Sequence, residues 1–183
     1  MTASSELVIR PAVPGDRDWI RRLMIDEWGA EIVAVHGMLY TPVKLPGFAA
    51  VRAGALSSRS SSGEEGGSGE RRVGLLTYSI AGQACEIVTL NSLESGQGIG
   101  SALIHAMRQF ASAAGCVRLW LITTNDNLSA IRFYQKRGFT LVAVHRNAVE
   151  ASRRLKPEIP LIGLDGIPIR DEIEMELPLE PRA

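Results

Sequence analysis

The chain has 183 residues, of which 45% are hydrophobic and 22% are charged, and its 20 Lys and Arg balance its 20 Asp and Glu. These values are those of an ordinary soluble globular protein, and they exclude a disordered tail, a collagen-like fibre and a disulfide miniprotein. The lack of a basic excess argues against a nucleic-acid partner. The length predicts one domain over residues 1–183.

The chain carries few of the residues that bind metals or form disulfides. Two cysteines, Cys85 and Cys116, and three histidines are scattered without the spacing of metal ligands, so we expect no metal. The N-terminal residues lack the apolar stretch of a signal peptide, and no apolar run approaches the ~20 residues that cross a bilayer. The sequence therefore predicts a cytoplasmic protein with no membrane partner.

The N-terminal part predicts short strands around one helix. Residues 7–10 form an apolar run closed by prolines, which predicts a strand. Asp16 or Asp18 can begin a helix whose apolar side chains recur every three or four positions. Residues 32–40 predict a strand or a hairpin, and residues 48–52 predict a further strand. The apolar positions of the helix are Ile20, Leu23, Met24 and Trp28.

The clearest change of composition lies at residues 54–72. This stretch consists almost entirely of Gly, Ser, Glu and Arg, which cannot bury apolar surface. We interpret it as the flexible tip of a hairpin rather than a domain linker. The segment before it, about 50 residues long, has too few apolar side chains to form a core of its own. A tail that docks a partner protein is the alternative.

The middle of the chain predicts a buried strand–helix–strand unit. Residues 73–80 and 86–90 predict two strands, and a glycine-rich turn follows them. The apolar stripe from Ile99 onward predicts an amphipathic helix that Gly115 ends. The dense apolar run over residues 117–122 predicts the next strand.

The strand over residues 86–90 carries one charged side chain. Strand alternation puts Glu86, Val88 and Leu90 on one face. A carboxylate on an otherwise apolar strand costs free energy unless it is paired or solvated. Glu86 is therefore a functional group, a solvated residue at an edge or a structural partner of an arginine.

The C-terminal part predicts two more helices and two more strands. A helix begins at Asp126 or Asn127 and ends at Gly138, a strand covers residues 139–145, and a short helix covers residues 149–155. The next segment, up to residue 170, is rich in Pro and Gly and predicts an ordered loop.

The last strand alternates apolar and acidic side chains. Ile173, Met175 and Leu177 predict a buried face, and the glutamates between them predict a wet face, which suits an edge of the sheet. The whole pattern predicts a mixed α/β fold with a single central sheet.

The glycine-rich turn has the physical features of an anion cradle. Its glycines let the backbone turn sharply and approach a ligand closely, and the following helix points its free N–H groups into the turn. A P-loop is excluded because no Lys follows, and a dinucleotide fingerprint is excluded because a serine stands at its third glycine position. The candidate cofactor-binding residues of the turn are Ser95, Gly96, Gln97, Gly98, Ile99, Gly100 and Ser101.

A second motif lies downstream of this turn. It reads Asn-x-x-Ala-x-x-Phe-Tyr-x-Lys-x-Gly-Phe and is formed by Asn127, Ala130, Phe133, Tyr134, Lys136, Gly138 and Phe139. Together with the Gly-x-Gly turn, it resembles the GNAT superfamily of acetyl-CoA-dependent N-acetyltransferases over residues 73–146. The resemblance implies a mostly antiparallel central sheet with helices on both faces, and acetyl-CoA as co-substrate.

The resemblance also implies a reaction and the residues that perform it. A primary amine of a small molecule or peptide attacks the thioester directly, so a base must take a proton from it. Glu86 is the candidate base, acting through water, and Tyr134 is the candidate acid beside the sulfur because a phenol stays protonated at neutral pH. A main-chain N–H near Leu90 or Asn91, at a bulge, is the expected oxyanion donor. Asn127 is expected to cap its helix and to contact the cofactor.

Two questions stay open at this stage. Ser95 stands where the family has Gln or Arg, so an acyl-CoA-binding sensor with weak catalysis is the alternative to an enzyme. Asp26, Glu27 and Glu31, close to Trp28, would suit a cationic acceptor, but an ordinary solvated acidic face is the favoured interpretation, and the acceptor stays unidentified. A monomer and a homodimer are both compatible with the sequence.

Overall fold

A computed structural model describes residues 6–53 and 69–180. Within these residues, seven strands form one sheet in the order β1-β4-β5-β6-β7-β9-β8, and every neighbouring pair is antiparallel except β6 and β7. The predicted α/β class with a mostly antiparallel sheet is confirmed. The strands are β1 (Leu7–Pro11), β4 (Gly47–Ala53), β5 (Glu70–Ala81), β6 (Ala84–Ser92), β7 (Arg118–Thr124), β8 (Thr140–His145) and β9 (Glu172–Pro178).

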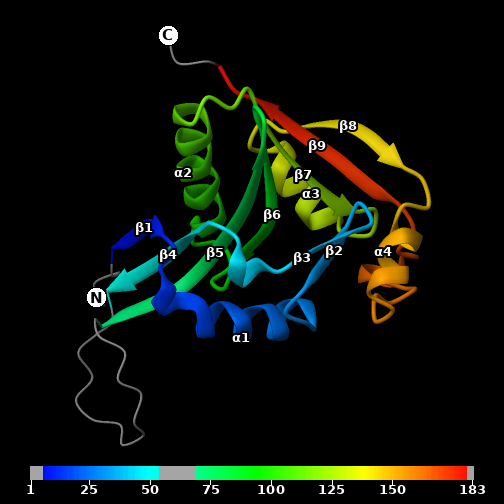
Figure 1. The fold of residues 1–183 in the computed structure, drawn as a ribbon, viewed down its shortest axis with the longest axis horizontal. Helices are drawn as coiled ribbons and strands as arrows, with labels where there is room; N and C mark the ends of the chain where they lie inside the picture. The colour runs from blue at the N-terminus through cyan, green and yellow to red at the C-terminus, as the bar shows by residue number, and fades with distance from the viewer. Residues whose placement is uncertain (1–5, 54–68, 181–183) are drawn as a thin grey trace, which may run out of the picture.

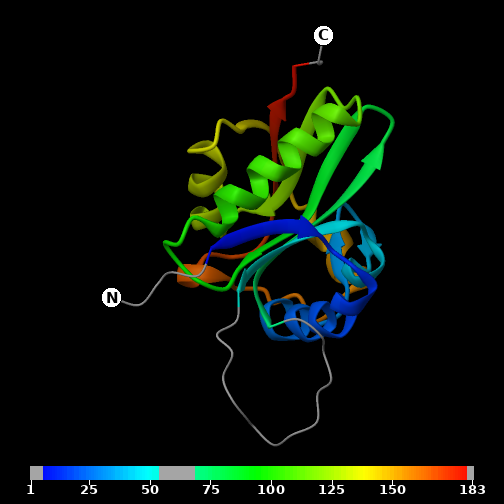
Figure 2. The ribbon, with the colours of Figure 1, turned by 90° about the vertical axis from the view of Figure 1, so that its left-hand side faces the viewer.

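Helices cover both faces of this sheet (Figures 1 and 2). One face carries α2 and α3, and the other carries α1, α4 and a small hairpin of β2 and β3. None of the helices in the described parts of the chain is long and apolar enough to cross a membrane. The elements are α1 (Arg17–Trp28), β2 (Val33–Val35), β3 (Met38–Tyr40), α2 (Ile99–Ala113), α3 (Leu128–Gln135) and α4 (Val149–Leu155).

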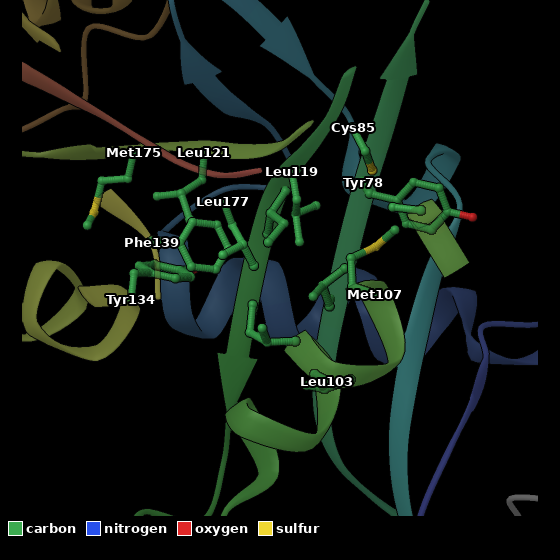
Figure 3. Close-up of a cluster of buried hydrophobic side chains, with 14 of the residues drawn as sticks. Tyr78, Cys85, Leu103, Met107, Leu119, Leu121, Tyr134, Phe139, Met175 and Leu177 are labelled. Atoms are coloured by element: carbon green, nitrogen blue, oxygen red, sulfur yellow. The ribbon is translucent and has the colours of Figure 1, made fainter. Parts of the chain in front are cut away.

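The larger core lies under α2. Leu103 and Met107 of this helix are fully buried against Leu119 of β7, and Figure 3 shows Tyr134 beside Phe139 in the same cluster. A smaller core on the opposite face joins the predicted stripe of α1 to Leu75. Since full burial of a leucine stabilises the fold by ~1.5–3 kcal/mol, these two cores fix the helices on the sheet.

The predicted hairpin around residues 54–72 is present as the pairing of β4 with β5. Residues 54–68 lie outside the described residues. The strand begins at Glu70 rather than at Val73, because its first arginines find carboxylate partners. Arg71 pairs with Glu94 at 2.5 Å, and that carboxylate also accepts from Arg52 at 3.0 Å.

Asp16 ties three segments together at the start of α1. Its side chain is fully buried and accepts from Arg10 at 2.7 Å, from Arg72 at 2.7 Å and from the Val13 N–H at 2.9 Å. It does not bond to the N–H groups of α1, so it stands at the helix start without acting as a side-chain cap. Burial alone would raise the pKa of this carboxyl group, but these donors hold it well below its usual range.

The expectation that the last strand lies at an edge was wrong, and its acidic face is only partly exposed because Glu172 is buried. β9 lies between β7 and β8, and β8 forms the edge. Glu172 is only 2% exposed, while Glu174 contacts Arg118 of β7 and accepts from His145 of β8 at 2.8 Å. Basic side chains on two flanking strands make the acidic face compatible with the sheet interior, and alternation along one strand does not reveal them.

We expect the Asp16→Ala variant to lose about 1.5–3 kcal/mol of unfolding free energy, because Arg10 and Arg72 lose a charged acceptor, although Arg10 keeps Glu70. Urea unfolding at neutral pH measures this loss. Asp18→Ala is the matched control, since that side chain is 84% exposed and pairs with Arg21 on the same helix. It should cost less than ~1 kcal/mol.

The same interaction predicts a direction for pH. The Asp16 contribution is present above the pKa of an unfolded Asp, about 3.9, and is lost as pH falls through the lower folded value. Wild type and Asp16→Ala should therefore converge in stability at acid pH. A stability difference that stayed constant down to pH 2 would contradict this assignment.

Candidate active site

The sheet opens where β6 and β7 run parallel. The two strands pair only over Ala84–Ile87 with Arg118–Leu121, although β6 continues to Ser92 and β7 to Thr124. Beyond Ile87 and Leu121 the facing backbone groups of the two strands no longer bond to each other. The strands therefore enclose a gap that reaches both faces of the sheet.

A bulge in β6 lies at the start of this gap. Thr77 of β5 opposes Thr89 while Tyr78 opposes Ile87, so Val88 is the extra residue. The bulge changes the alternation, and Leu90 packs with the α2 core whereas Glu86 lines a cavity on the other face. The expectation that Glu86 and Leu90 share a face was therefore wrong, and the bulge lies before the position that the family resemblance implied.

The backbone of β6 offers a free donor toward the gap. The Leu93 N–H donates to Val73 of β5 at 2.9 Å, and donor directions alternate along a strand. The N–H of Asn91 therefore points to β5, while that of Leu90 points toward the gap. Between the two candidate oxyanion donors, the geometry favours Leu90. The Asn91 side chain instead accepts from the Trp28 ring nitrogen at 3.4 Å on the α1 face.

The glycine turn has the backbone that the cradle hypothesis requires. Gly96 and Gly98 have φ of 73° and 74°, which side-chain-bearing residues rarely adopt, and α2 begins immediately afterwards. The first turn of α2 leaves N–H groups without an intrahelical acceptor. Gly100 lets this turn approach α3, since a Cβ there would lie 2.8 Å from the Phe133 ring. Ile99 is buried in the core and Gln97 is exposed.

Two adjoining cavities lie along this turn. One, of about 390 Å³, runs between β6 and α3 and is lined by Leu90, Asn127 and Tyr134. The other, of about 400 Å³, is lined by the glycines of the turn, Ser101 and Arg137. Ser92, Ser95, Gly100 and Phe133 line both. The structure thus brings most of the predicted cofactor residues together, but Asn91 and Gln97 line neither cavity.

Arg137 is a cation at this site that sequence reasoning missed. Its Nε donates to the Ser101 hydroxyl at 3.1 Å, and its guanidinium stacks 3.4 Å from the Phe133 ring centroid. Arg137 occupies an unspecified position of the second motif, beside Gly138. That position in the motif was the sequence feature that could have pointed to it. Arg132, on the same helix as Phe133, lines neither cavity.

Tyr134 faces the cavity between β6 and α3 from an apolar setting. Its ring packs 5.1 Å from that of Phe133 and 5.3 Å from that of Phe139, and the residue is 7% exposed. Burial raises the pKa of its phenol well above the ordinary value. The side chain is therefore a neutral hydroxyl that can donate a proton.

A third cavity, of about 120 Å³, lies on the α1 face of the gap. Glu86 and Glu172 line it together with Trp28 and the apolar side chains of β2. Asn127 lines this cavity and the one between β6 and α3, so it stands where the two faces meet. The predicted cap at Asn127 is confirmed, because its side chain accepts from the Ala130 N–H at 3.1 Å.

Glu86 is held in this third cavity by a hydrogen bond from Tyr40. It is 6% exposed, and one oxygen accepts from the Tyr40 hydroxyl at 2.9 Å. Burial raises its pKa, the bond from Tyr40 offsets part of the shift, and the nearby Glu172 adds to it. The same contact and burial raise the pKa of Tyr40 to about 12, so its proton stays on the phenol.

Glu172 is a second carboxylate that sequence reasoning treated as solvated. It accepts from the Ser152 hydroxyl at 3.0 Å and from the His36 N–H at 3.2 Å. The imidazole of His36 lies between the carboxylates, and its Nε2 is 3.9 Å from Glu86. Burial lowers the pKa of His36 despite these acids, so the ring is neutral at neutral pH.

The acidic residues at the end of α1 do not join this cavity. Asp26, Glu27 and Glu31 are exposed and line none of the three cavities, as expected for an ordinary solvated face. In the described residues no group of three or more His, Cys, Asp or Glu side chains is placed to hold a metal ion.

Comparison with known proteins identifies the family. The model of the acetyltransferase (GNAT) family matches residues 63–139. Two uncharacterized proteins of Bacillus subtilis strain 168 are similar: YdhI is 46% identical over 146 residues, covering 80% of this chain and 82% of YdhI. YxbD is 35% identical over 165 residues, covering 90% of this chain and 94% of YxbD.

The fold has solved counterparts as well. An acetyltransferase of Bacillus subtilis in complex with CoA superposes with a TM-score of 0.61 at 18% identity, covering 96% of this chain and 100% of that chain. At that identity the likeness concerns the fold. Taken with the family match and the two relatives, these findings show that the chain belongs to the GNAT family and is an acetyl-CoA-dependent acyltransferase.

Proposed function

We propose that this protein transfers the acetyl group of acetyl-CoA to a primary amine of a small molecule or peptide by direct attack. The observation that carries the proposal is the gap between β6 and β7. The cavity beside Tyr134 and the cavity beside Glu86 open on opposite faces of the sheet, and Asn127 lines both. A donor bound on one face can thus meet an acceptor bound on the other.

The glycine turn and Arg137 suit the pyrophosphate of CoA. A helix N-terminus with free N–H groups binds anions, and the guanidinium of Arg137 adds a full positive charge on the same cavity. The carboxylate of Glu94 also lines this cavity, but Arg52 and Arg71 pair with it. Ser95 lines the cavity, and the backbone donors do not depend on its side chain.

Three groups of the protein take part in the reaction in this proposal. Glu86 takes a proton from the attacking amine through water, and its raised pKa brings it closer to that task. The Leu90 N–H donates to the oxygen that gains negative charge as the carbon–nitrogen bond forms. Tyr134 gives its proton to the departing sulfur as the carbon–sulfur bond breaks.

The first test is calorimetric titration with acetyl-CoA, with desulfo-CoA and NAD as comparisons. We expect micromolar binding of acetyl-CoA and no heat from NAD. Binding without turnover on any amine would favour the alternative of an acyl-CoA sensor. No binding of either coenzyme form would contradict the proposal.

Gly98→Val should weaken CoA binding at least about tenfold, because the backbone N–H groups of the turn lose their geometry. Losing one hydrogen bond to a charged group lowers affinity by about that factor. Gly82→Val is the matched control. Both glycines have positive φ, and a Cβ at either would meet no described atom within 4 Å. Both variants should lose about 1–2 kcal/mol of stability, but only Gly98→Val should lose affinity.

Glu86→Gln and Tyr134→Phe should each lower kcat by about 10²–10⁴-fold, the usual contribution of a general base or acid. CoA affinity, measured by titration, should stay within a factor of about three for both. Loss of CoA binding together with activity would instead assign these side chains a structural role.

Tyr40→Phe should shift the acid limb of kcat/KM to higher pH. The base works when it is deprotonated, so activity falls as pH drops through the pKa of Glu86, and the Tyr40 bond holds that pKa down. Losing the bond should move the limb to higher pH. Tyr78→Phe, in the opposite core, should leave the limb unchanged. Using one acceptor for all variants removes the ionisation of the amine from the comparison.

A further inference from the structure

The cavity on the α1 face combines negative charge with apolar walls. Glu86 and Glu172 line it, and the remaining lining, as far as the structure describes it, contains no Lys, Arg or His. The apolar part of the wall comes from Val33 and Val35 of β2, Val88 of β6 and Ile122 of β7. This lining fits an aliphatic ligand that carries positive charge, since carboxylates removed from water need a cationic or donor partner.

One oxygen of Glu86 is left for such a ligand. The Tyr40 hydroxyl takes the other oxygen, and the nearest cationic candidate for the free one is His36 Nε2 at 3.9 Å, beyond hydrogen-bond distance. That Nε2 is buried and has no hydrogen-bond partner among the described residues. The second oxygen of Glu86 belongs to a side chain that lines the cavity, so it can accept from a donor that enters there.

Glu172 supplies a second negative charge close by. The His36 imidazole spans the two carboxylates, with Nδ1 3.6 Å from Glu172 and Nε2 3.9 Å from Glu86. The neutral partners Ser152 and the His36 N–H orient Glu172 without cancelling its charge. A carboxylate has lone pairs for about four bonds, so Glu172 can still accept from a ligand.

The space is small and covered. Its volume of about 120 Å³ corresponds to roughly four waters at ~30 Å³ each. The β2–β3 hairpin lies over this part of the sheet, and α4 packs on the hairpin (Figure 1). A folded protein surface or a large amino sugar does not enter such a site, whereas a short alkyl chain does.

We propose that the acceptor is a compact aliphatic amine with a second cationic group, a short diamine in its simplest form. One amino group lies at Glu86, facing the gap, and is acetylated, while the other stays charged beside Glu172. This inference rests on the acetyl transfer proposed above and adds the class of acceptor. Glu172 acts here as a binding residue for the non-reacting end.

The test compares three acceptors of equal length with acetyl-CoA: 1,4-diaminobutane, n-butylamine and 4-aminobutanoate. We expect kcat/KM to be at least about tenfold higher for the diamine than for n-butylamine, the usual effect of one bond to a charged group. The carboxylate of 4-aminobutanoate should lower it further through repulsion by Glu172. Equal rates for the diamine and n-butylamine would overturn the inference.

Glu172→Gln isolates the second charge. It should raise KM for the diamine about tenfold, whereas any change that acts through the pKa of Glu86 should affect the diamine and n-butylamine equally. Glu176→Gln is the matched control, because Glu176 lies on the same strand and does not line the cavity. Melting curves check that both variants fold, and the wild-type comparison stands even where a variant does not.

The outcomes separate this inference from the proposed function. Absence of acetyl-CoA binding would defeat the acetyl transfer itself. A second outcome is that the protein binds acetyl-CoA and acetylates peptides or monoamines with no preference for the diamine. That outcome would contradict only the proposed class of acceptor. A diamine preference that survives Glu172→Gln would contradict the role of that carboxylate.

Discussion

The early end of the parallel pairing between β6 and β7 is the constraint on which the site depends. Four residue pairs hold the strands together up to Ile87 and Leu121, and from there each strand follows its own path. The bulge at Val88 lies in the same region, and it changes which face of the sheet the β6 side chains point to before and after it. Because a sheet is otherwise continuous, only such an opening lets cavities on its two faces meet.

Three of the buried carboxylates in the described part of the chain lie in three different environments. Asp16 is surrounded by arginine donors, which keep it ionised and make it a structural anchor. Glu172 is held by neutral donors, a hydroxyl and a main-chain N–H. Glu86 has one phenol as a partner, and burial dominates its titration. The chemistry open to each carboxylate follows from its neighbours rather than from its residue type.

Much of the fold could be predicted from the sequence. The apolar stripe of α1, the amphipathic α2 and the short α4 all lie where periodicity predicted them, because their spacing is set by the local backbone geometry. The start of β5 was predicted too late, since the polar residues there are stabilised by distant carboxylates. The glycine turn could be predicted because positive φ angles leave a compositional mark.

The sequence alone determined which segments are helices and strands, where the backbone must turn, and which family pattern the chain carries. The tertiary structure decided the face of Leu90, the interior place of β9, the approach of Arg137 to Ser101 and the meeting of His36 with Glu86 and Glu172. These features depend on register and pairing between residues far apart in the chain. Local periodicity has no information on such contacts, because it describes only neighbours along one element.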